Sequence, residues 1–274
     1  MPQRVLALAL VLCALFHLPQ SVAAEFEPKV GQPGKDVIWV PTPNSLVERM
    51  LEMAHVTPKD FLVDLGSGDG RTVIAAAKRG IKALGIEFNP DMVALSRANA
   101  ERAGVGERAT FVHGDVFKED FSQASVVTMY LLSSLNVKLR PTLLNMKPGT
   151  RVVSHAFNMG DWSPDETSSV NGYTAYMWIV PAKVQGRWQG TGPSGAFDLT
   201  LDQTYQKVTG KVTGSGLAPN VADPILEGNK IQFTLVDSAG RFLRFRGTVN
   251  GNAMEGSVQV PGGTEARWSA RRAG

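Results

Sequence analysis

The stretch FLVDLGSGDGR, residues 61–71, decides the fold that we predict for the larger part of the chain. It reads as a short buried β-strand that runs directly into a loop with three glycines. A strand, a glycine loop and a helix in this order open many doubly wound parallel sheets, in which the loop holds a nucleotide. This loop also carries Asp64 and Asp69, and two carboxylates would repel a phosphate. The stretch therefore indicates a nucleotide-like ligand without phosphate groups.

Short apolar strands alternate with helix-like segments from about Trp39 to Val180, which predicts an α/β fold with a doubly wound, mostly parallel, Rossmann-like sheet. We expect strands at 61–65, 82–88, 109–117, 125–132 and 150–157, and helices at 44–56, 71–79, 90–104 and 134–146. Asn44 is a good N-cap for the first helix, and Pro141 should kink or divide the last one. Residues 166–180 read as an antiparallel edge hairpin, because Asn171-Gly172 suits a type I′ turn.

After Pro181 the pattern changes to short strands separated by Gly, Pro and Asn turns, without a helix-period segment. Seven such strands predict a small all-β barrel or sandwich. We therefore predict two domains, residues 25–182 and residues 183–274. The first carries 16 Lys and Arg against 18 Asp and Glu, and the second carries 11 against 7. Neither balance indicates a nucleic-acid partner, for which a dense basic stripe is typical.

Residues 1–24 have the layout of a secretory signal peptide. Arg4 precedes an apolar run at 5–16, and Val22 and Ala24 suit the −3 and −1 positions of a cleavage site. The run is shorter than the ~20 residues that a membrane-spanning helix needs, so we expect no stable span after cleavage. The one cysteine, Cys13, lies in this run, which leaves the processed chain without a disulfide or a thiolate metal site. We predict a periplasmic or secreted protein.

S-adenosylmethionine accounts for both the glycines and the carboxylates of the loop. The pattern Gly66, Gly68, Gly70 departs from the dinucleotide fingerprint, whose third glycine position is Arg71 here. S-adenosylmethionine has no phosphate, it carries a sulfonium and an ammonium, and its methionine part can lie close to bare backbone beside glycines. Asp64 can meet the ammonium, directly or through water. The predicted binding loop therefore comprises Asp64, Gly66, Ser67, Gly68 and Gly70.

Two further carboxylates stand where the next two strands end. Glu87 follows Gly66 by 21 positions, near the ~20-residue spacing at which an acidic side chain takes ribose hydroxyls. Asp115 ends the third strand, where it can accept a hydrogen bond from the adenine amino group. The carboxyl ends of parallel strands lie together beside the point where strand order reverses. Acidic residues at three consecutive strand ends are a strong signal for this cofactor.

With these residues, positions 39–181 resemble a class I methyltransferase that uses S-adenosylmethionine. DLGSGDGR together with the upstream VPTP is most similar to the lysine methyltransferase group that includes the histone Dot1-type enzymes and the mitochondrial enzymes modifying the ATP synthase c subunit. In that group the segment matching WVPTP lies over the methionine end of the cofactor, so the resemblance makes Thr42 a candidate donor to its carboxylate. The alternative for Thr42 is a plain turn residue between two prolines. The second domain loosely resembles the small Gly-rich β-barrel modules of secreted bacterial proteins.

The methyl acceptor should enter near the end of the fourth strand, where Tyr130 either lines the acceptor channel or packs in the core. His155 ends the next strand and is either a catalytic residue or a satisfied histidine beneath a loop. Transfer to a neutral nitrogen relies mainly on proximity and alignment, so no dedicated acid or base is required. We predict an S-adenosylmethionine-dependent methyltransferase that acts on a protein lysine or a small molecule. The alternative is a catalytically idle methyltransferase fold that serves as a binding module of the cell envelope.

Overall fold

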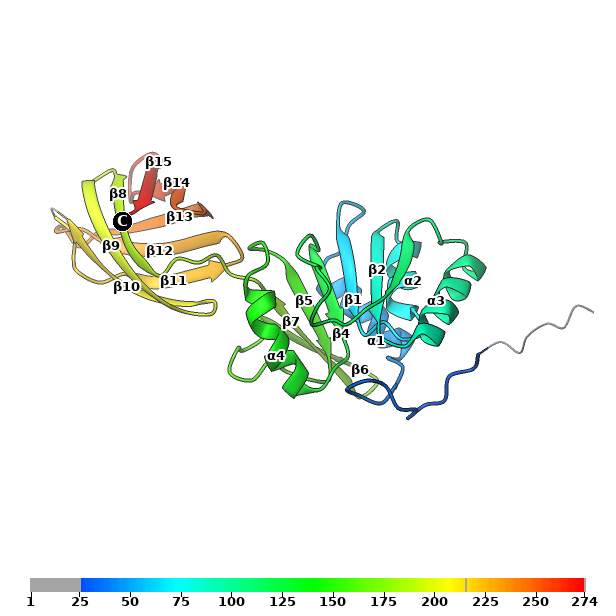
Figure 1. Cartoon of the computed structure of the whole chain (residues 1–274). Coiled ribbons are helices and arrows are strands. Elements are labelled where there is room, and N and C mark those ends of the chain that lie inside the picture. Colours follow the sequence, from blue (N-terminus) through cyan, green and yellow to red (C-terminus); the bar gives the residue numbers. More distant parts are fainter. Residues whose placement is uncertain (1–25, 215, 274) are drawn as a thin grey trace, which may run out of the picture.

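The computed structural model describes residues 26–214 and 216–273, and the predicted signal peptide lies outside them. Two sheets follow one another along these residues (Figure 1). No helix in the described ranges is long and apolar enough to cross a membrane. The first part of the chain contains α1 (Asn44–Met53), β1 (Phe61–Leu65), α2 (Arg71–Lys78), β2 (Lys82–Glu87), α3 (Pro90–Arg102), β3 (Ala109–His113), β4 (Val126–Met129), α4 (Ser133–Leu144), β5 (Arg151–His155), β6 (Glu166–Val170) and β7 (Tyr173–Ile179).

The first sheet has the strand order β3-β2-β1-β4-β5-β7-β6, so the direction of the chain order reverses between β1 and β4. The strands β1 to β5 pair in parallel, and Leu62 has Ala83 on one side and Val126 on the other. β7 pairs antiparallel with β5, and β6 completes a hairpin at the edge. The turn residues Asn171 and Gly172 have φ values of 51° and 81°, which a type I′ turn requires. These strands confirm the predicted doubly wound sheet with its antiparallel edge hairpin.

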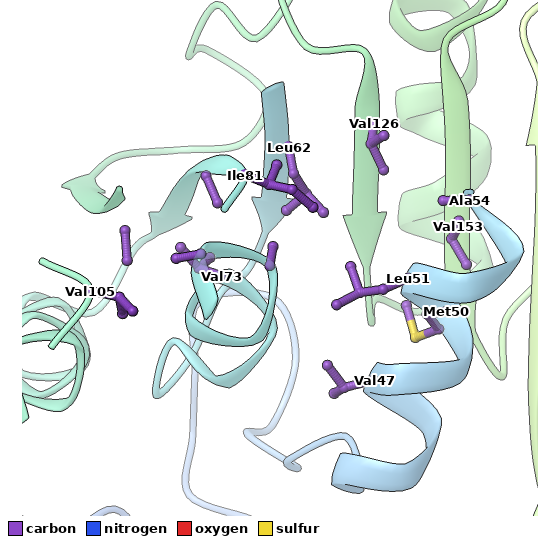
Figure 2. Packing of buried hydrophobic residues seen from close by; sticks show 14 of the residues in the cluster. Val47, Met50, Leu51, Ala54, Leu62, Val73, Ile81, Val105, Val126 and Val153 are labelled. Carbon is purple, nitrogen blue, oxygen red and sulfur yellow. The ribbon is translucent and has the colours of Figure 1, made fainter. Parts of the chain in front are cut away.

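Successive residues of the central strands pack on opposite faces of the sheet. On one face Leu62, Val126 and Val153 cluster with the apolar sides of α1 and α2 (Figure 2). Residues of α3 belong to the same cluster. On the other face Val63 and Val127 cluster with residues of α4 and of the segment that follows β5. Because both faces are covered, the strands are apolar on both sides, as parallel sheets usually are. The ends of the strands remain available for a ligand.

The N-cap predicted for α1 is wrong, and one of the two effects expected of Pro141 in α4 does not occur. Asn44 is the first helical residue of α1, while Pro43 takes the cap position and no side chain caps this helix. Pro141 does not divide α4, which is one continuous helix. Leu139 and Leu143 lie on either side of Pro141 and are buried against the sheet. Their packing holds the two halves of the helix together although the proline removes one backbone hydrogen bond.

The second sheet is antiparallel and has the order β10-β9-β8-β15-β14-β13-β12-β11. Its edge strands approach each other, because the N–H of Val212 donates to the Pro219 carbonyl and that of Val221 to the Gly210 carbonyl. The sheet is therefore a nearly closed barrel, which confirms the predicted all-β part. Its strands are β8 (Gly186–Gly192), β9 (Gly195–Thr204), β10 (Lys207–Gly214), β11 (Ala222–Glu227), β12 (Lys230–Val236), β13 (Phe242–Asn250), β14 (Ala253–Gln259) and β15 (Ala266–Arg272).

The barrel has eight strands among the described residues, and the sequence predicts seven of them; the strand that it misses is β11. Pro224 lies within it, and a proline argues against a strand. β11 is an edge strand with an irregular register between Ala222 and Ile225, where a missing N–H is tolerated. The barrel interior is filled by side chains, and the ring of Phe245 lies 5.5 Å from that of Trp268. The barrel therefore has a packed core like that of an ordinary small domain.

The barrel meets the first sheet beside α4, as Figure 1 shows. The ring of Tyr205 stacks on Trp162 with 5.9 Å between centroids, and the guanidinium of Arg140 lies over the same tyrosine. Gln206 accepts a hydrogen bond from the indole of Trp162 and donates one to Asp165, both at 3.1 Å. These contacts join the two parts of the chain directly.

Candidate active site

The glycine loop turns the chain from β1 into α2 with three residues in the left-handed region. Gly66, Gly68 and Gly70 have φ values of 77°, 53° and 81°, which side chains other than glycine rarely tolerate. The N–H groups of Gly66 and Ser67 both donate to the Ile86 carbonyl, at 2.9 and 3.1 Å. These bonds tie the loop to the end of β2. The loop therefore lies beside the first two strand ends.

Close contacts add a second requirement for two of these glycines. A Cβ on Gly70 would lie 2.7 Å from the Cβ of Ser96 and 2.7 Å from the ring of Phe111. Gly70 thus allows α2 to start against α3 and β3. A Cβ on Gly68 would lie 2.6 Å from the indole nitrogen of Trp39. Gly68 therefore permits the chain before α1 to reach the loop.

Asp64, at the carboxyl end of β1, is an almost fully buried carboxyl group. It accepts a hydrogen bond from the Thr128 hydroxyl on β4 at 2.6 Å. Burial raises the pKa of Asp64 to about 7, and the negative charges of Glu87 and Asp69 contribute to the rise. The group is thus balanced between its protonated and ionised forms near neutral pH. A cation beside it would favour the ionised form.

Glu87 and Asp115 lie at the ends of the next two strands. The Glu87 carboxylate accepts from the backbone N–H groups of Gly68 and Asn89, both at 2.9 Å, which fixes it against the glycine loop. Asp115 forms an ion pair with Lys35 at 2.8 Å, and this hydrogen-bonded cation lowers the pKa of the carboxyl group. The three carboxylates predicted at consecutive strand ends therefore lie together at the carboxyl ends of β1, β2 and β3, next to the point where the strand order reverses between β1 and β4.

A segment before α1, residues 31–42, lies over these strand ends, and we call it the cover segment. It folds back on itself through two backbone hydrogen bonds that join Trp39 to residues 31 and 32. The indole of Trp39 reaches the glycine loop at Gly68, and Lys35 reaches Asp115. The cover segment thus bridges the loop and the end of β3.

A cavity of about 540 Å³ lies between the cover segment, the glycine loop and the strand ends. This volume falls in the range of small-molecule sites. Gly70 and His155, both predicted as site residues, do not line it: Gly70 serves packing, and His155 lies behind the cavity wall. The other predicted residues all line the cavity, namely Thr42, Asp64, Gly66, Ser67, Gly68, Glu87, Asp115 and Tyr130.

Tyr130 and His155 stack at the ends of β4 and β5, with 3.7 Å between ring centroids. His155 is only 2% exposed, and its Nδ1 lies 3.1 Å from the Thr42 hydroxyl. Burial lowers the pKa of His155 to about 4, so the imidazole is neutral at pH 7. Phe157 continues the aromatic surface 5.9 Å from Tyr130 and lines the cavity. His155 therefore supports Thr42 and Tyr130 from behind.

Most of the cavity-lining residues are missing from the predicted set, and three of them, Lys35, Trp39 and Arg71, join the cover segment to the rest of the site. Arg71 donates to both carboxylate oxygens of Asp69 at 2.6–3.2 Å and to the Thr42 carbonyl at 3.0 Å. It therefore ties the glycine loop to the cover segment. The family resemblance of WVPTP pointed to the region of Trp39. No pattern in the sequence singles out Lys35 or Arg71.

The charges around the cavity fit S-adenosylmethionine and oppose a phosphorylated coenzyme. The two cationic side chains that line the cavity, Lys35 and Arg71, already form ion pairs with carboxylates. A sulfonium and an ammonium are attracted to such a site, whereas a pyrophosphate is repelled. The hydroxyl of Ser67 has no hydrogen-bond partner among the described residues, but it is buried against Gly85, where a Cβ would lie 2.4 Å from it, so it is not exposed to the cavity. The acidic residues that line the cavity are Asp36, Asp64, Asp69, Glu87 and Asp115.

The reversal point, the glycine loop and the acidic strand ends together define a class I methyltransferase dependent on S-adenosylmethionine. Residues 64–166 match the family described as the ANTKMT methyltransferase domain. A protein-lysine N-methyltransferase from Saccharolobus islandicus is 45% identical over 151 residues, which are 53% of this chain and 94% of that protein. The mouse lysine N-methyltransferase for the c subunit of ATP synthase is 38% identical over 146 residues, 53% of this chain and 59% of that protein. The chain belongs to the lysine methyltransferase family that these proteins represent.

A crystal structure from Salinibacter ruber extends the comparison to three dimensions. That protein, described as an RNA methyltransferase in complex with S-adenosyl-L-homocysteine, is 52% identical to this chain. The match has a TM-score of 0.52 and covers 53% of this chain and 96% of that chain. S-adenosylhomocysteine is what remains of S-adenosylmethionine after it gives up its methyl group. S-adenosylmethionine is therefore the cofactor of this chain.

Proposed function

We propose that the chain is an exported protein-lysine N-methyltransferase, in which S-adenosylmethionine supplies an electrophilic methyl group to a lysine side chain. The observation that carries the choice of acceptor is the 45% identity with the Saccharolobus islandicus protein-lysine N-methyltransferase over 94% of its length. The second support is chemical: the cavity combines an acidic part with an uncharged aromatic part. The first part suits the cofactor and the second suits an alkyl amine.

We assign the cofactor to the acidic part of the cavity. Asp64 takes the ammonium, Glu87 takes the ribose hydroxyls, and Asp115 takes the adenine amino group. The N–H groups that hold Glu87 beside the glycine loop keep its carboxylate in one orientation. Gly66, Ser67 and Gly68 leave room for the methionine part, while Gly70 acts through packing. Thr42 reaches the cavity with a hydroxyl that His155 already orients.

We assign the acceptor to the aromatic end, where Tyr130 and Phe157 line the cavity together with Leu132 and Leu135. These walls match the apolar stem of a lysine. Loss of water around the amine lowers its pKa and favours the neutral form that can attack a methyl group. The positive charge that forms on the nitrogen faces aromatic rings, which attract cations. His155 stays neutral behind Tyr130 and adds no repelling charge.

Export rests on the N-terminal pattern, in which Arg4, the apolar run at 5–16 and the small residue Ala24 follow one another. Mass spectrometry of the protein purified from cells tests it. A mature N-terminus at Glu25 supports export, and an intact residue 1 in all recovered protein contradicts it.

The acceptor is tested by incubating the purified chain with cofactor labelled in its methyl group and a cell extract. Radioactive methyl-lysine in the acid hydrolysate of the protein fraction supports the proposal. Label confined to a ribonuclease-sensitive fraction would instead support RNA, the second candidate, which the description of the Salinibacter ruber protein favours. Cofactor binding without transfer to any fraction would support the idle binding module.

A matched pair of variants shows whether the label depends on this site. Glu87→Lys reverses the charge beside the glycine loop and should abolish cofactor binding and transfer. Glu255→Lys makes the same change at an exposed position of β14 and should leave both unchanged. Equal labelling by the two variants would mean that the activity comes from a contaminating enzyme.

A further inference from the structure

The outer side chains of the barrel are separated by charge. On β8, β13, β14 and β15 the exposed charged residues give five positive charges and one negative. On β9, β10 and β11 they give two positive charges and four negative. The first set consists of Arg187, Arg244, Arg246, Arg267, Arg271 and Glu255, and the second of Lys207, Lys211, Asp198, Asp202, Asp223 and Glu227. We call the five arginines of the first set the arginine face.

The strand register places these arginines close together. Arg246 on β13 pairs with Ser257 on β14, which pairs with Arg267 on β15. The two arginines therefore lie two strands apart on the same face, at a backbone spacing of roughly 10 Å. Arg244 lies two residues along β13 from Arg246, about 7 Å away and with its side chain on the same side. The positive charges thus spread in two directions over the sheet.

The fold makes no use of these five side chains. None of them forms a side-chain hydrogen bond or an ion pair with another residue in 26–214 or 216–273. Arg272 provides the contrast, since it donates to the carbonyls of Lys183 and Gln185 and lies over the ring of Trp188. Neighbouring like charges on a sheet repel one another. Because these strands carry five exposed arginines against one exposed carboxylate, Glu255, among the described residues, the arginine face is complementary to an external anionic surface.

We propose that the arginine face docks the protein on the surface of an anionic lipid bilayer. The flanking Phe242 supports this partner, because it is 59% exposed and projects from β13 on the same side as Arg244. An apolar ring beside basic residues is the composition of an interfacial membrane site. Proteins that bind single-stranded RNA on a sheet use several stacked aromatic rings. Among the described residues of these strands, the arginine face has only Phe242 as an exposed aromatic ring. Its residues line neither the cofactor cavity nor a second, shallower groove that lies beside Pro224 and Ile225 of β11.

Vesicle binding by the chain from residue 25 onward, which contains both domains, tests the docking. Sedimentation with vesicles of phosphatidylcholine alone should recover no protein, and vesicles with 30% phosphatidylglycerol should bind it at 0.1 M salt. Binding should fall steeply at 0.5 M salt, because salt screens exposed charges. Arg246→Gln combined with Arg267→Gln should weaken binding by about thirtyfold, since each basic residue near an anionic surface contributes about fivefold.

Lys207→Gln combined with Lys211→Gln is the matched control, since it removes the same charge from the opposite part of the barrel. It should change binding less than threefold. Cofactor affinity, measured by calorimetry, should be the same for both variants and the wild type, so this test is independent of the methyl acceptor. Equal losses in the two variants, or binding that ignores lipid charge, would overturn the docking site. Tighter binding to a single-stranded RNA oligonucleotide than to the anionic vesicles would overturn the choice of partner.

Discussion

Replacing Asp64 by asparagine tests the electrostatic cost that the buried carboxyl group imposes on the protein without its cofactor. Burial, with the charges of Glu87 and Asp69, raises the pKa of Asp64 to about 7, against ~3.9 in an unfolded chain. An acid whose pKa is raised by folding binds its proton more tightly in the folded state. Its stabilising effect is therefore present at low pH and is lost as the pH rises from about 4 to about 7. Three pKa units correspond to roughly 4 kcal/mol.

We expect the ionisation of Asp64 to lower the free energy of unfolding of the wild type by about 3 kcal/mol between pH 5 and pH 8. Asp64→Asn should not show this part of the loss, because an amide does not titrate and can still accept from Thr128. Urea denaturation of both proteins at pH 5, 6, 7 and 8, without cofactor, measures the difference. The variant should gain stability relative to the wild type with each step.

Asp60→Asn is the control with the opposite sign. Partial burial opposes ionisation of Asp60, but hydrogen bonds from Ser125 and Thr57 and the cation Arg151 lower its pKa overall. Its contribution is present above about pH 4 and is lost only as the pH falls further. This variant should be destabilised by a constant amount from pH 5 to 8. A constant difference for Asp64→Asn as well would refute the raised pKa.

The same reasoning extends to the cofactor, whose cationic groups should hold Asp64 in its ionised form. Calorimetry should show affinity rising between pH 6 and pH 8 and proton release on binding near pH 6.5. Asp64→Asn should bind the cofactor at least tenfold more weakly and release no proton. Proton uptake by the wild type would contradict the assignment of a cation to this carboxylate.

Three further outcomes follow from the packing around the site. Gly70→Ala should destabilise the protein by about 2–4 kcal/mol in urea denaturation, because Gly70 has a left-handed conformation and close neighbours. Gly104 is also left-handed but has no atoms within 4 Å of an added Cβ, so Gly104→Ala should cost only about 1 kcal/mol. Trp39→Ala should weaken cofactor binding about tenfold in calorimetry by uncovering Gly68, and unchanged affinity would show that the cover segment plays no part. His155→Gln should lower kcat by the same factor at every pH from 6 to 9, because His155 is already neutral over this range. A ratio of wild-type to variant kcat that changes with pH would mean that His155 titrates during turnover.

The sequence predicts the sheet because its signals are local and agree with one another. Each strand is a run of apolar residues that precedes a turn or a helix start. In the structure α3 begins at Pro90 as expected, and Asn89 caps it. The errors occur where packing overrides a local rule. Pro224 sits in an edge strand and Pro141 in a helix, and neighbouring strands or buried leucines hold both segments in place. Proline rules describe the isolated segment, and tertiary contacts decided these two cases.

The site likewise contains residues that the sequence predicts and residues that it does not. Asp64, Glu87 and Asp115 are predictable because parallel topology brings strand ends together, whatever else the chain does. The cover segment is not predictable, because its position depends on pairs far apart in sequence, such as Lys35 with Asp115 and Thr42 with His155. Residues 31–42 also show no helical or strand periodicity that would place them. Only the likeness to known enzymes located this segment.

The sign of the charge at the strand ends explains how a sheet widely used for phosphorylated coenzymes serves a different ligand here. The topology supplies the same reversal point and the same bare glycine backbone in both cases. At this point Asp64 and Glu87 project toward the ligand, and the nearby cation Arg71 is bound to Asp69. An anion at this place would add to the charge that already raises the pKa of Asp64, whereas a cation would relieve it. The protein therefore selects its cofactor by charge, and the sheet determines only where the cofactor lies.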